Sequence, residues 1–222
     1  MEYSEGKNES VIVDIKYQQH RYFYRCIKRI FDFVASLIGL IFLSPVFLLI
    51  AISIKVEDPS GPVFYSQIRL GRNQIPFKMY KFRSMVVNAD KLLSQLLDKN
   101  EINGAMFKMK RDPRVTLVGS FIRKYSLDEL PQLMNVLLGQ MSLVGPRPPL
   151  PREVEEYTEY DKQRLTVKPG CTGLWQVTLR NKVGFSEMVR LDLQYINRRG
   201  VLLDLYVLIR TVTVFFKPNG AY

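Results

Sequence analysis

The sequence contains a single histidine and only two cysteines among its 222 residues. With His20 alone, the chain cannot build a zinc site on histidines or a Ser/His/Asp triad. Cys26 and Cys171 do not form a CxxC pair, which argues against a disulfide framework and a cysteine metal site. The sequence also lacks a P-loop, a GxGxxG motif after a strand and a DxD pair. Any acid or base chemistry must therefore come from carboxylates.

Acidic side chains are scarce in the middle of the chain, where basic ones gather. The sequence has 32 Lys and Arg against 21 Asp and Glu, a net charge of +11. Residues 64–126 hold 13 of the basic and 4 of the acidic side chains, including a dense patch at Lys108, Lys110, Arg111 and Arg114. This excess indicates an anionic partner: nucleic acid, anionic lipid or a phosphorylated substrate.

Charges are absent from residues 33–54, a run of 22 residues that is long enough to cross about 30 Å of hydrocarbon. Ser44 and Pro45 stand at its middle, and proline breaks or kinks a helix. Basic residues flank both ends and favour the cytoplasmic side for each. We therefore predict a re-entrant helix broken at Ser44 and Pro45, with a spanning helix as the alternative. The Ser44 hydroxyl is a candidate partner for the backbone groups that the break frees.

The periodicity of the remaining segments predicts one hairpin and several helices. Residues 63–71 and 77–85 alternate as two paired strands, which places Lys81 and Arg83 on one face. Helical spacing covers 88–99, 130–144, 153–165, 185–197 and 201–216, the last as an interfacial or core helix, and a further helix is expected through 121–122. GPRPPLP at 145–151 is a stiff loop that either orients Arg147 toward a phosphate or serves as a connector.

These patterns predict an α+β fold that is predominantly helical. We expect a monotopic membrane protein with a broken re-entrant helix, interfacial amphipathic helices and a small β-hairpin. Its expected parts are an N-terminal arm at 1–26, the re-entrant membrane helix at 27–56 and a cytoplasmic catalytic domain at 57–222.

The stretch SLDELPQL at 126–133 holds two adjacent carboxylates, Asp128 and Glu129. Ser126 and Glu129 have the spacing of a capping box, but Pro131 would then lie inside the helix, so we expect the helix to begin at Asp128 or just after it. Neighbours on a helix point about 100° apart and cannot share a proton. One carboxylate could instead attack phosphorus while the other holds magnesium. The pair is therefore either a helix cap or a catalytic pair.

Several motifs together resemble the bacterial sugar transferases, also called monotopic phosphoglycosyl transferases or polyprenyl-phosphate hexose-1-phosphate transferases. They are KRIFDFVASLIGLIFLSP, GPVFYSQIRLG, FKMYKFRSM, DPRVTLVGSFIRKYSLDELPQL, NVLLGQMSLVGPRP and KPGCTGLWQV. The resemblance runs from about Lys28 to Tyr222 and is to the minimal form of the family. It implies transfer of a sugar 1-phosphate from a UDP-sugar to undecaprenyl phosphate, the first membrane step of exopolysaccharide, capsule or glycan synthesis, on the cytoplasmic face of the bacterial inner membrane.

The resemblance also implies roles for individual residues. Asp128 would be the nucleophile that forms an aspartyl phosphosugar and releases UMP, and Glu129 would bind Mg²⁺. Arg123 would contact phosphate, and the break of the membrane helix would lie at Ser44 and Pro45. The remaining substrate-binding candidates are Pro146, Arg147 and Pro148 in the loop near the nucleotide and the basic positions Lys81, Arg83 and Arg111.

One motif departs from the family pattern, because LWQVTLRN stands where LWQVSGRN is expected, so that Thr178 and Leu179 could alter substrate choice. We expect a UDP-sugar, undecaprenyl phosphate and membrane lipid as partners and no nucleic acid, with a homodimer left open. The alternative functions are a non-catalytic membrane-tethered scaffold and a protein that binds an anionic ligand.

Overall fold

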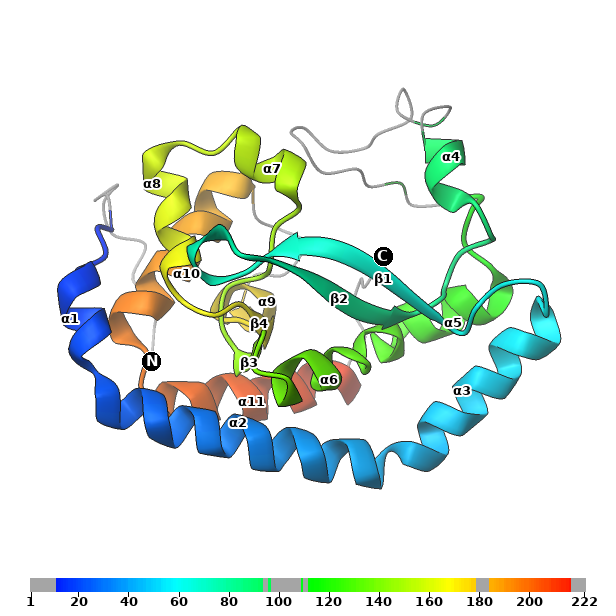
Figure 1. Cartoon of the computed structure of the whole chain (residues 1–222), viewed down its shortest axis with the longest axis horizontal. Coiled ribbons are helices and arrows are strands. Elements are labelled where there is room, and N and C mark those ends of the chain that lie inside the picture. The colour runs from blue at the N-terminus through cyan, green and yellow to red at the C-terminus, as the bar shows by residue number, and fades with distance from the viewer. Residues whose placement is uncertain (1–10, 94–95, 97–108, 110–111, 179–183, 217–222) are drawn as a thin grey trace.

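In a computed structural model of the chain, the structure describes residues 11–93, 96, 109, 112–178 and 184–216. Helices predominate and the sheets are small, so the predicted α+β class is confirmed (Figure 1). In chain order the elements are α1 (Ile15–His20), α2 (Tyr22–Phe42), α3 (Ser44–Glu57), β1 (Phe64–Leu70), η1 (Arg72–Gln74), β2 (Pro76–Phe82), α4 (Ala89–Leu93), α5 (Leu117–Lys124), η3 (Leu127–Glu129), α6 (Gln132–Leu137), β3 (Ser142–Val144), α7 (Pro151–Glu155), α8 (Glu159–Lys162), η4 (Gln163–Thr166), β4 (Gly170–Thr172), α9 (Leu174–Thr178), α10 (Phe185–Arg198) and α11 (Val201–Phe216).

The long apolar segment forms two helices that meet at a bend. α2 ends at Phe42 and α3 begins at Ser44 with Pro45 in its first turn, and the two axes differ by 58°. The Ser44 hydroxyl donates to the carbonyl of Ile41 at 2.7 Å, which satisfies one acceptor near the break. In the described part of the chain, no single helix has the length and hydropathy to cross a membrane, whereas α2 and α3 taken together do.

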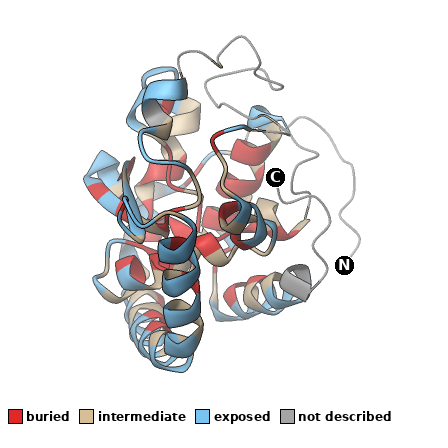
Figure 2. Ribbon diagram, turned by 90° about the vertical axis from the view of Figure 1, so that its right-hand side faces the viewer, coloured by how far each residue is buried: buried red, intermediate tan, exposed pale blue. Residues whose placement is uncertain are grey.

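In α2 polar side chains are buried and large apolar ones are exposed, which is the reverse of the pattern in a helix of a soluble protein. The buried residues of α2 are Tyr24, Asp32 and Ser36, which turn toward the rest of the molecule. Large apolar side chains are exposed instead, along α2, α3 and α11, and pale blue marks much of these outer faces in Figure 2. A soluble helix turns its apolar stripe inward, so an outward stripe of this size indicates an apolar contact surface.

The predicted hairpin is confirmed, since β1 and β2 pair antiparallel from Phe64 opposite Phe82 to Leu70 opposite Pro76. Its turn passes through Asn73 and Gln74, both in the left-handed region with φ of 56° and 62°. Phe82 packs with buried residues of α3 and α5, so one end of the hairpin is fixed against these two helices.

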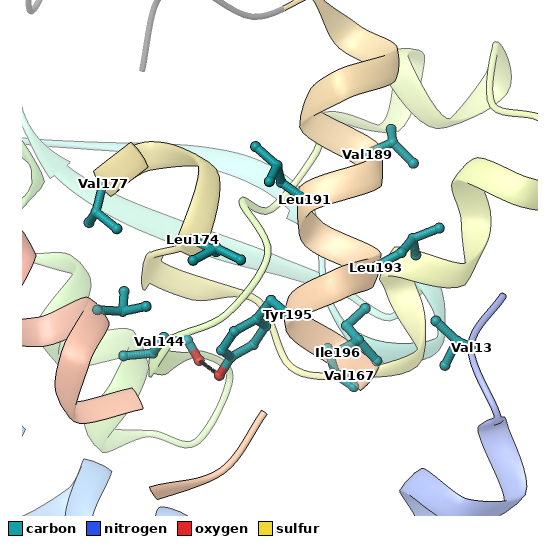
Figure 3. Close-up of a cluster of buried hydrophobic side chains, with 11 residues drawn as sticks. Val13, Val144, Val167, Leu174, Val177, Val189, Leu191, Leu193, Tyr195 and Ile196 are labelled. Atoms are coloured by element: carbon teal, nitrogen blue, oxygen red, sulfur yellow. Dashed lines mark hydrogen bonds between the residues drawn. The ribbon is translucent and has the colours of Figure 1, made fainter. Parts of the chain in front are cut away.

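The main core lies around α10 (Figure 3). Val189, Leu193 and Ile196 from this helix are fully buried, and the Tyr195 hydroxyl donates to the carbonyl of Val144 in β3 at 3.1 Å. β3 and β4 pair in parallel, and a Cβ on Gly170 would collide with the Gly145 backbone. This close approach fixes the start of the proline-rich loop against the core.

Two predicted helices are wrong in extent. The helix expected at 130–144 ends at Leu137, because Gly139 adopts a φ of +79° and the chain turns into β3. The helix expected at 153–165 is divided into α7, α8 and η4, since Thr158 and Asp161 form a capping box that begins a second helix. The helices predicted at 185–197 and 201–216 correspond to α10 and α11. Of the helix expected at 88–99, the described residues show α4, and most of the remainder lies outside them.

Candidate active site

The acid pair lies in a single 3₁₀ turn between α5 and α6. Ser126 adopts a left-handed conformation, with φ of 51°, and turns the chain sharply after α5. Its side chain makes no capping hydrogen bond, and the α-helix begins at Gln132, after Pro131. The helix start expected at Asp128 or just after it is therefore too early, because Pro131 is accommodated in front of α6 rather than within it.

The two carboxylates differ in exposure but share one cation. The Asp128 side chain is 11% exposed, whereas the Glu129 side chain is 39% exposed. Lys81 from β2 places its Nζ 2.6 Å from Glu129 Oε1 and 3.9 Å from Asp128 Oδ2. The hairpin thus delivers one ammonium to both acids, which offsets the repulsion between them.

The surroundings shift the pKa values of Asp128 and Glu129 in opposite directions. Burial, together with the neighbouring Glu129 carboxylate, raises the pKa of Asp128 to about 6, although Lys81 and Arg123 act to lower it. Partial loss of solvent disfavours the ionised form of Glu129, but Lys81, Arg147 and Arg69 outweigh this effect and lower the pKa of that carboxyl. Environments that separate the pKa values of adjacent acids are characteristic of catalytic sites.

Arg123, in the last turn of α5, is close enough to Asp128 to act on its charge. Its charge is one of those that lower the pKa of Asp128. Its Nη1 is buried and has no hydrogen-bond partner within the described residues. A buried guanidinium nitrogen without an acceptor is uncommon, and a phosphate oxygen would satisfy it.

Two arginines that the sequence analysis did not single out bind backbone carbonyls of the proline-rich loop after β3. Pro146 and Pro148 are buried. Arg69 in β1 donates to the carbonyl of Pro148 at 3.0 Å, and Arg164 in η4 donates to that of Arg147 at 3.4 Å. A sequence signal for Arg69 existed in β1, because residues two apart in a strand lie on the same face, which places Arg69 beside Gln67. In the structure Gln67 Oε1 accepts a hydrogen bond from Arg69 Nη2 at 2.7 Å. Nothing local marks Arg164.

Of the basic positions predicted to bind substrate, the structure places Lys81 at the acid pair but not Arg83. Lys81 reaches the acid pair, whereas Arg83 lies one residue past β2 and binds Asp58, with Nη1 2.8 Å from Oδ2. Arg83 therefore ties the end of the hairpin to the segment after α3. Arg111 lies outside the described residues.

The predicted Mg²⁺ ion has few carboxylates to bind in the described residues. Among the described residues no group of three or more His, Cys, Asp and Glu side chains gathers into a metal site. Magnesium in such enzymes commonly takes one or two carboxylates and completes its shell with substrate phosphates and water. Glu129 is one such carboxylate, and Lys81 would share it with the ion.

Residues 23–218 match the family model described as "Bacterial sugar transferase". The chain belongs to the bacterial sugar transferase family. Among the relatives of this transferase chain, the galactosyl transferase CpsE of Streptococcus agalactiae is 44% identical over 203 residues, which are 91% of this chain and 45% of CpsE.

Two other members illustrate how much of a sugar transferase the chain represents. The undecaprenyl-phosphate galactose phosphotransferase of Salmonella typhimurium is 46% identical over 89% of this chain and 42% of its own length. The exopolysaccharide production protein ExoY of Sinorhizobium fredii is 41% identical over 88% of each chain. The chain thus spans less than half the length of CpsE and the Salmonella protein but most of ExoY.

The departure from the expected sugar transferase motif lies at the end of α9. The Thr178 hydroxyl donates to the carbonyl of Leu174 at 2.8 Å, so it is engaged within its own helix. Leu179 lies outside the described residues. The effect of this pair on substrate choice stays a prediction.

Proposed function

We propose that this sugar transferase moves a sugar 1-phosphate from a UDP-sugar to undecaprenyl phosphate at the cytoplasmic face of a bacterial membrane. The observation that carries the proposal is the buried Asp128, which lies beside Glu129 and Lys81 and near an unsatisfied Arg123 donor. This arrangement suits attack on a phosphorus atom whose departing and remaining oxygens are anionic. The relatives named for undecaprenyl phosphate and galactose support the same substrate classes.

The proposed reaction has two displacement steps. An Asp128 carboxylate oxygen attacks the phosphorus that bears the sugar, the bond to UMP breaks, and an aspartyl phosphosugar forms. A phosphate oxygen of undecaprenyl phosphate then attacks the same phosphorus, which regenerates the carboxylate and yields the undecaprenyl diphosphate sugar. Bound magnesium, held by Glu129, would offset the charge of the diphosphate and of the leaving UMP.

The chain's own cations have separate tasks in this scheme. The Lys81 ammonium lies near both carboxylates and offsets the repulsion between their negative charges. Arg123 offers its buried Nη1 to a phosphate oxygen next to Asp128. Arg147, held by Arg164 through its carbonyl, is positioned by the stiff proline loop near Glu129, where its charge lowers the pKa of that acid. A preformed set of cations of this kind stabilises charge without further reorganisation.

The outer surface of the molecule supports the membrane location. α2 and α3 expose apolar side chains, and α2 turns polar ones inward. We propose that the bent pair enters and leaves the bilayer on the same face. Cysteines placed at Ser4 and at Glu57, in a Cys26→Ser background, should both resist a membrane-impermeant thiol reagent applied from outside. Labelling of only one position would rule out re-entry.

The catalytic assignment is tested with Asp128→Asn. This variant should lose turnover and covalent labelling by a radiolabelled nucleotide sugar, whereas Glu156→Gln, an exposed acid in another part of the fold, should keep both. The unaltered chain should release UMP before the acceptor is added. This release should stop when a chelator removes magnesium. Persistent turnover in Asp128→Asn would reject the nucleophile, and polymer synthesis in cells that carry this variant would favour a scaffold.

The donor sugar is open to a direct test. A panel of UDP-sugars, assayed for UMP release, should show preference for a hexose, because the relatives carry galactose and glucose in their names. Thr178→Ser/Leu179→Gly, which restores the expected motif, is the matched variant for the same panel.

A further inference from the structure

A cavity of about 370 Å³ lies beside the first turns of α2. It is bordered by the hairpin turn, β3, the segment between η4 and β4, and the end of α10. None of Asp128, Glu129, Lys81, Arg123 and Arg147 lines it. This cavity is therefore a separate feature from the candidate active site.

The lining is strongly cationic. Among the described lining residues Asp32 is the one acidic side chain, and its carboxylate accepts a hydrogen bond from the Leu143 backbone N–H at 3.1 Å. Six basic side chains line the cavity: Arg25, Lys28, Arg29, Arg72, Lys168 and Arg199. Like charges gathered in a partly enclosed space repel one another unless an anion lies among them.

Part of this positive charge, that of Arg29 and Arg199, is held by neutral acceptors among the described residues. Lys28 pairs with Asp204 at 2.8 Å. Arg29 donates to the carbonyls of Val136 and Leu137, and Arg199 donates to Gln18. Those acceptors are neutral, so they orient the two guanidiniums without cancelling their charge.

Arg72 and Lys168 are placed to receive a ligand. The Nε of Arg72 is buried and has no hydrogen-bond partner in the described part of the chain. A Cβ added to Gly139 would lie 3.2 Å from Arg29 Nη2 and 3.6 Å from Lys168 Nζ, so these two cations flank one point. Partial burial, together with the charges of Arg29, Arg72 and Arg25, lowers the pKa of Lys168, whereas Asp32 acts to raise it.

The position of the cavity along α2 indicates where its anion comes from. The lining residues of this helix lie between Tyr22 and Asp32, directly before the uncharged run at 33–54. The same turns expose Ile27, Ile30 and Phe31 on another side. Residues that precede a membrane segment lie at the level of lipid headgroups, and basic pockets at this level bind anionic ones.

We propose that this cavity binds the phosphate of an anionic phospholipid headgroup, as a lipid site separate from that of the acceptor. Arg72 and Lys168 contact the phosphate, and Arg29, fixed on the end of α6, supplies the charge behind it. The site would anchor the start of the broken helix to anionic membrane. It rests only on the membrane association in the proposed function and is independent of chemistry at Asp128.

The test uses the full chain in non-ionic detergent and counts bound lipid by native mass spectrometry. Dihexanoyl phosphatidylglycerol should bind saturably, and dihexanoyl phosphatidylcholine and inorganic phosphate should bind far more weakly. Arg72→Gln/Lys168→Gln should weaken phosphatidylglycerol binding about tenfold or more. Equal binding of phosphatidylcholine, or of inorganic phosphate, would overturn the lipid assignment.

Matched variants separate the cavity from general surface charge. Arg152→Gln/Lys55→Gln removes two exposed charges elsewhere and should leave the affinity within about twofold. Arg72→Lys/Lys168→Arg keeps the charges and should keep the binding. Equal weakening by both neutralising pairs would show delocalised attraction and reject the site. Asp128→Asn should bind phosphatidylglycerol normally, so a failure of the proposed reaction would not be mistaken for a failure of this site.

Discussion

Breaking the ion pair between Arg164 and Asp192 should cost more stability than breaking an exposed pair, because both side chains are 1% exposed. Arg164 Nη2 lies 2.5 Å from Asp192 Oδ2. Asp192→Asn leaves the guanidinium buried without its counter-charge, which costs about 3–5 kcal/mol. In a chain of this length each kcal/mol lowers Tm by about 2–4 °C, so Tm should fall by about 6–20 °C. The Arg147 carbonyl that Arg164 holds would lose its support in the same variant.

A second variant separates the buried charge from the lost contact. Arg164→Met/Asp192→Leu removes both ions and should be more stable than Asp192→Asn, because no uncompensated charge stays buried. Burial raises the pKa of Asp192 to about 6, against the effect of Arg164, so thermal unfolding should be followed in mildly alkaline buffer, where the carboxylate is ionised. A double variant less stable than Asp192→Asn, or a single variant within about 1 kcal/mol of the unaltered chain, would refute this reasoning.

Three further changes have defined outcomes. Lys81→Met should lower kcat/KM about 10–100-fold by removing a charge-assisted hydrogen bond, and Lys81→Arg should restore part of it in the UMP-release assay. Asp204→Asn should lower Tm, because its carboxylate accepts from Lys28, Tyr24 and Tyr195, and an unchanged Tm would contradict that role. Gly119→Ala should destabilise the fold, since its Cβ would collide with backbone, whereas Gly184→Ala, with nothing within 4 Å, should be nearly neutral in the same thermal scan.

The features that sequence predicted correctly are those with a local signal. The hairpin follows from alternation on both sides of a turn, and α10 and α11 follow from uninterrupted helical spacing. The bend at Ser44 and Pro45 follows from a single residue that cannot continue a helix. In each case the residues that decide the structure lie next to one another in the chain.

The errors arise where distant contacts or backbone conformation decide. Apolar spacing continues beyond Leu137, yet Gly139 in a left-handed conformation ends the helix, a C-terminal signal that the periodicity concealed. Arg164 and Asp192 are 28 residues apart, and Arg69 and Pro148 are 79 apart. Only the packed fold brings such pairs together, so the support behind the proline loop could not be predicted.

The position of Asp128 changes the physical explanation of the site. A carboxylate at the first turn of a long helix would owe its charge to the helix dipole. Asp128 instead lies in a three-residue 3₁₀ turn, with Ser126 left-handed in front and α6 only six residues long behind. What keeps the buried carboxylate ionisable is the pair of cations from other elements, Lys81 on the hairpin and Arg123 on α5. The reactivity of the pair therefore depends on the docking of the hairpin against α5 and η3, and changes that loosen this docking should alter activity without touching either acid.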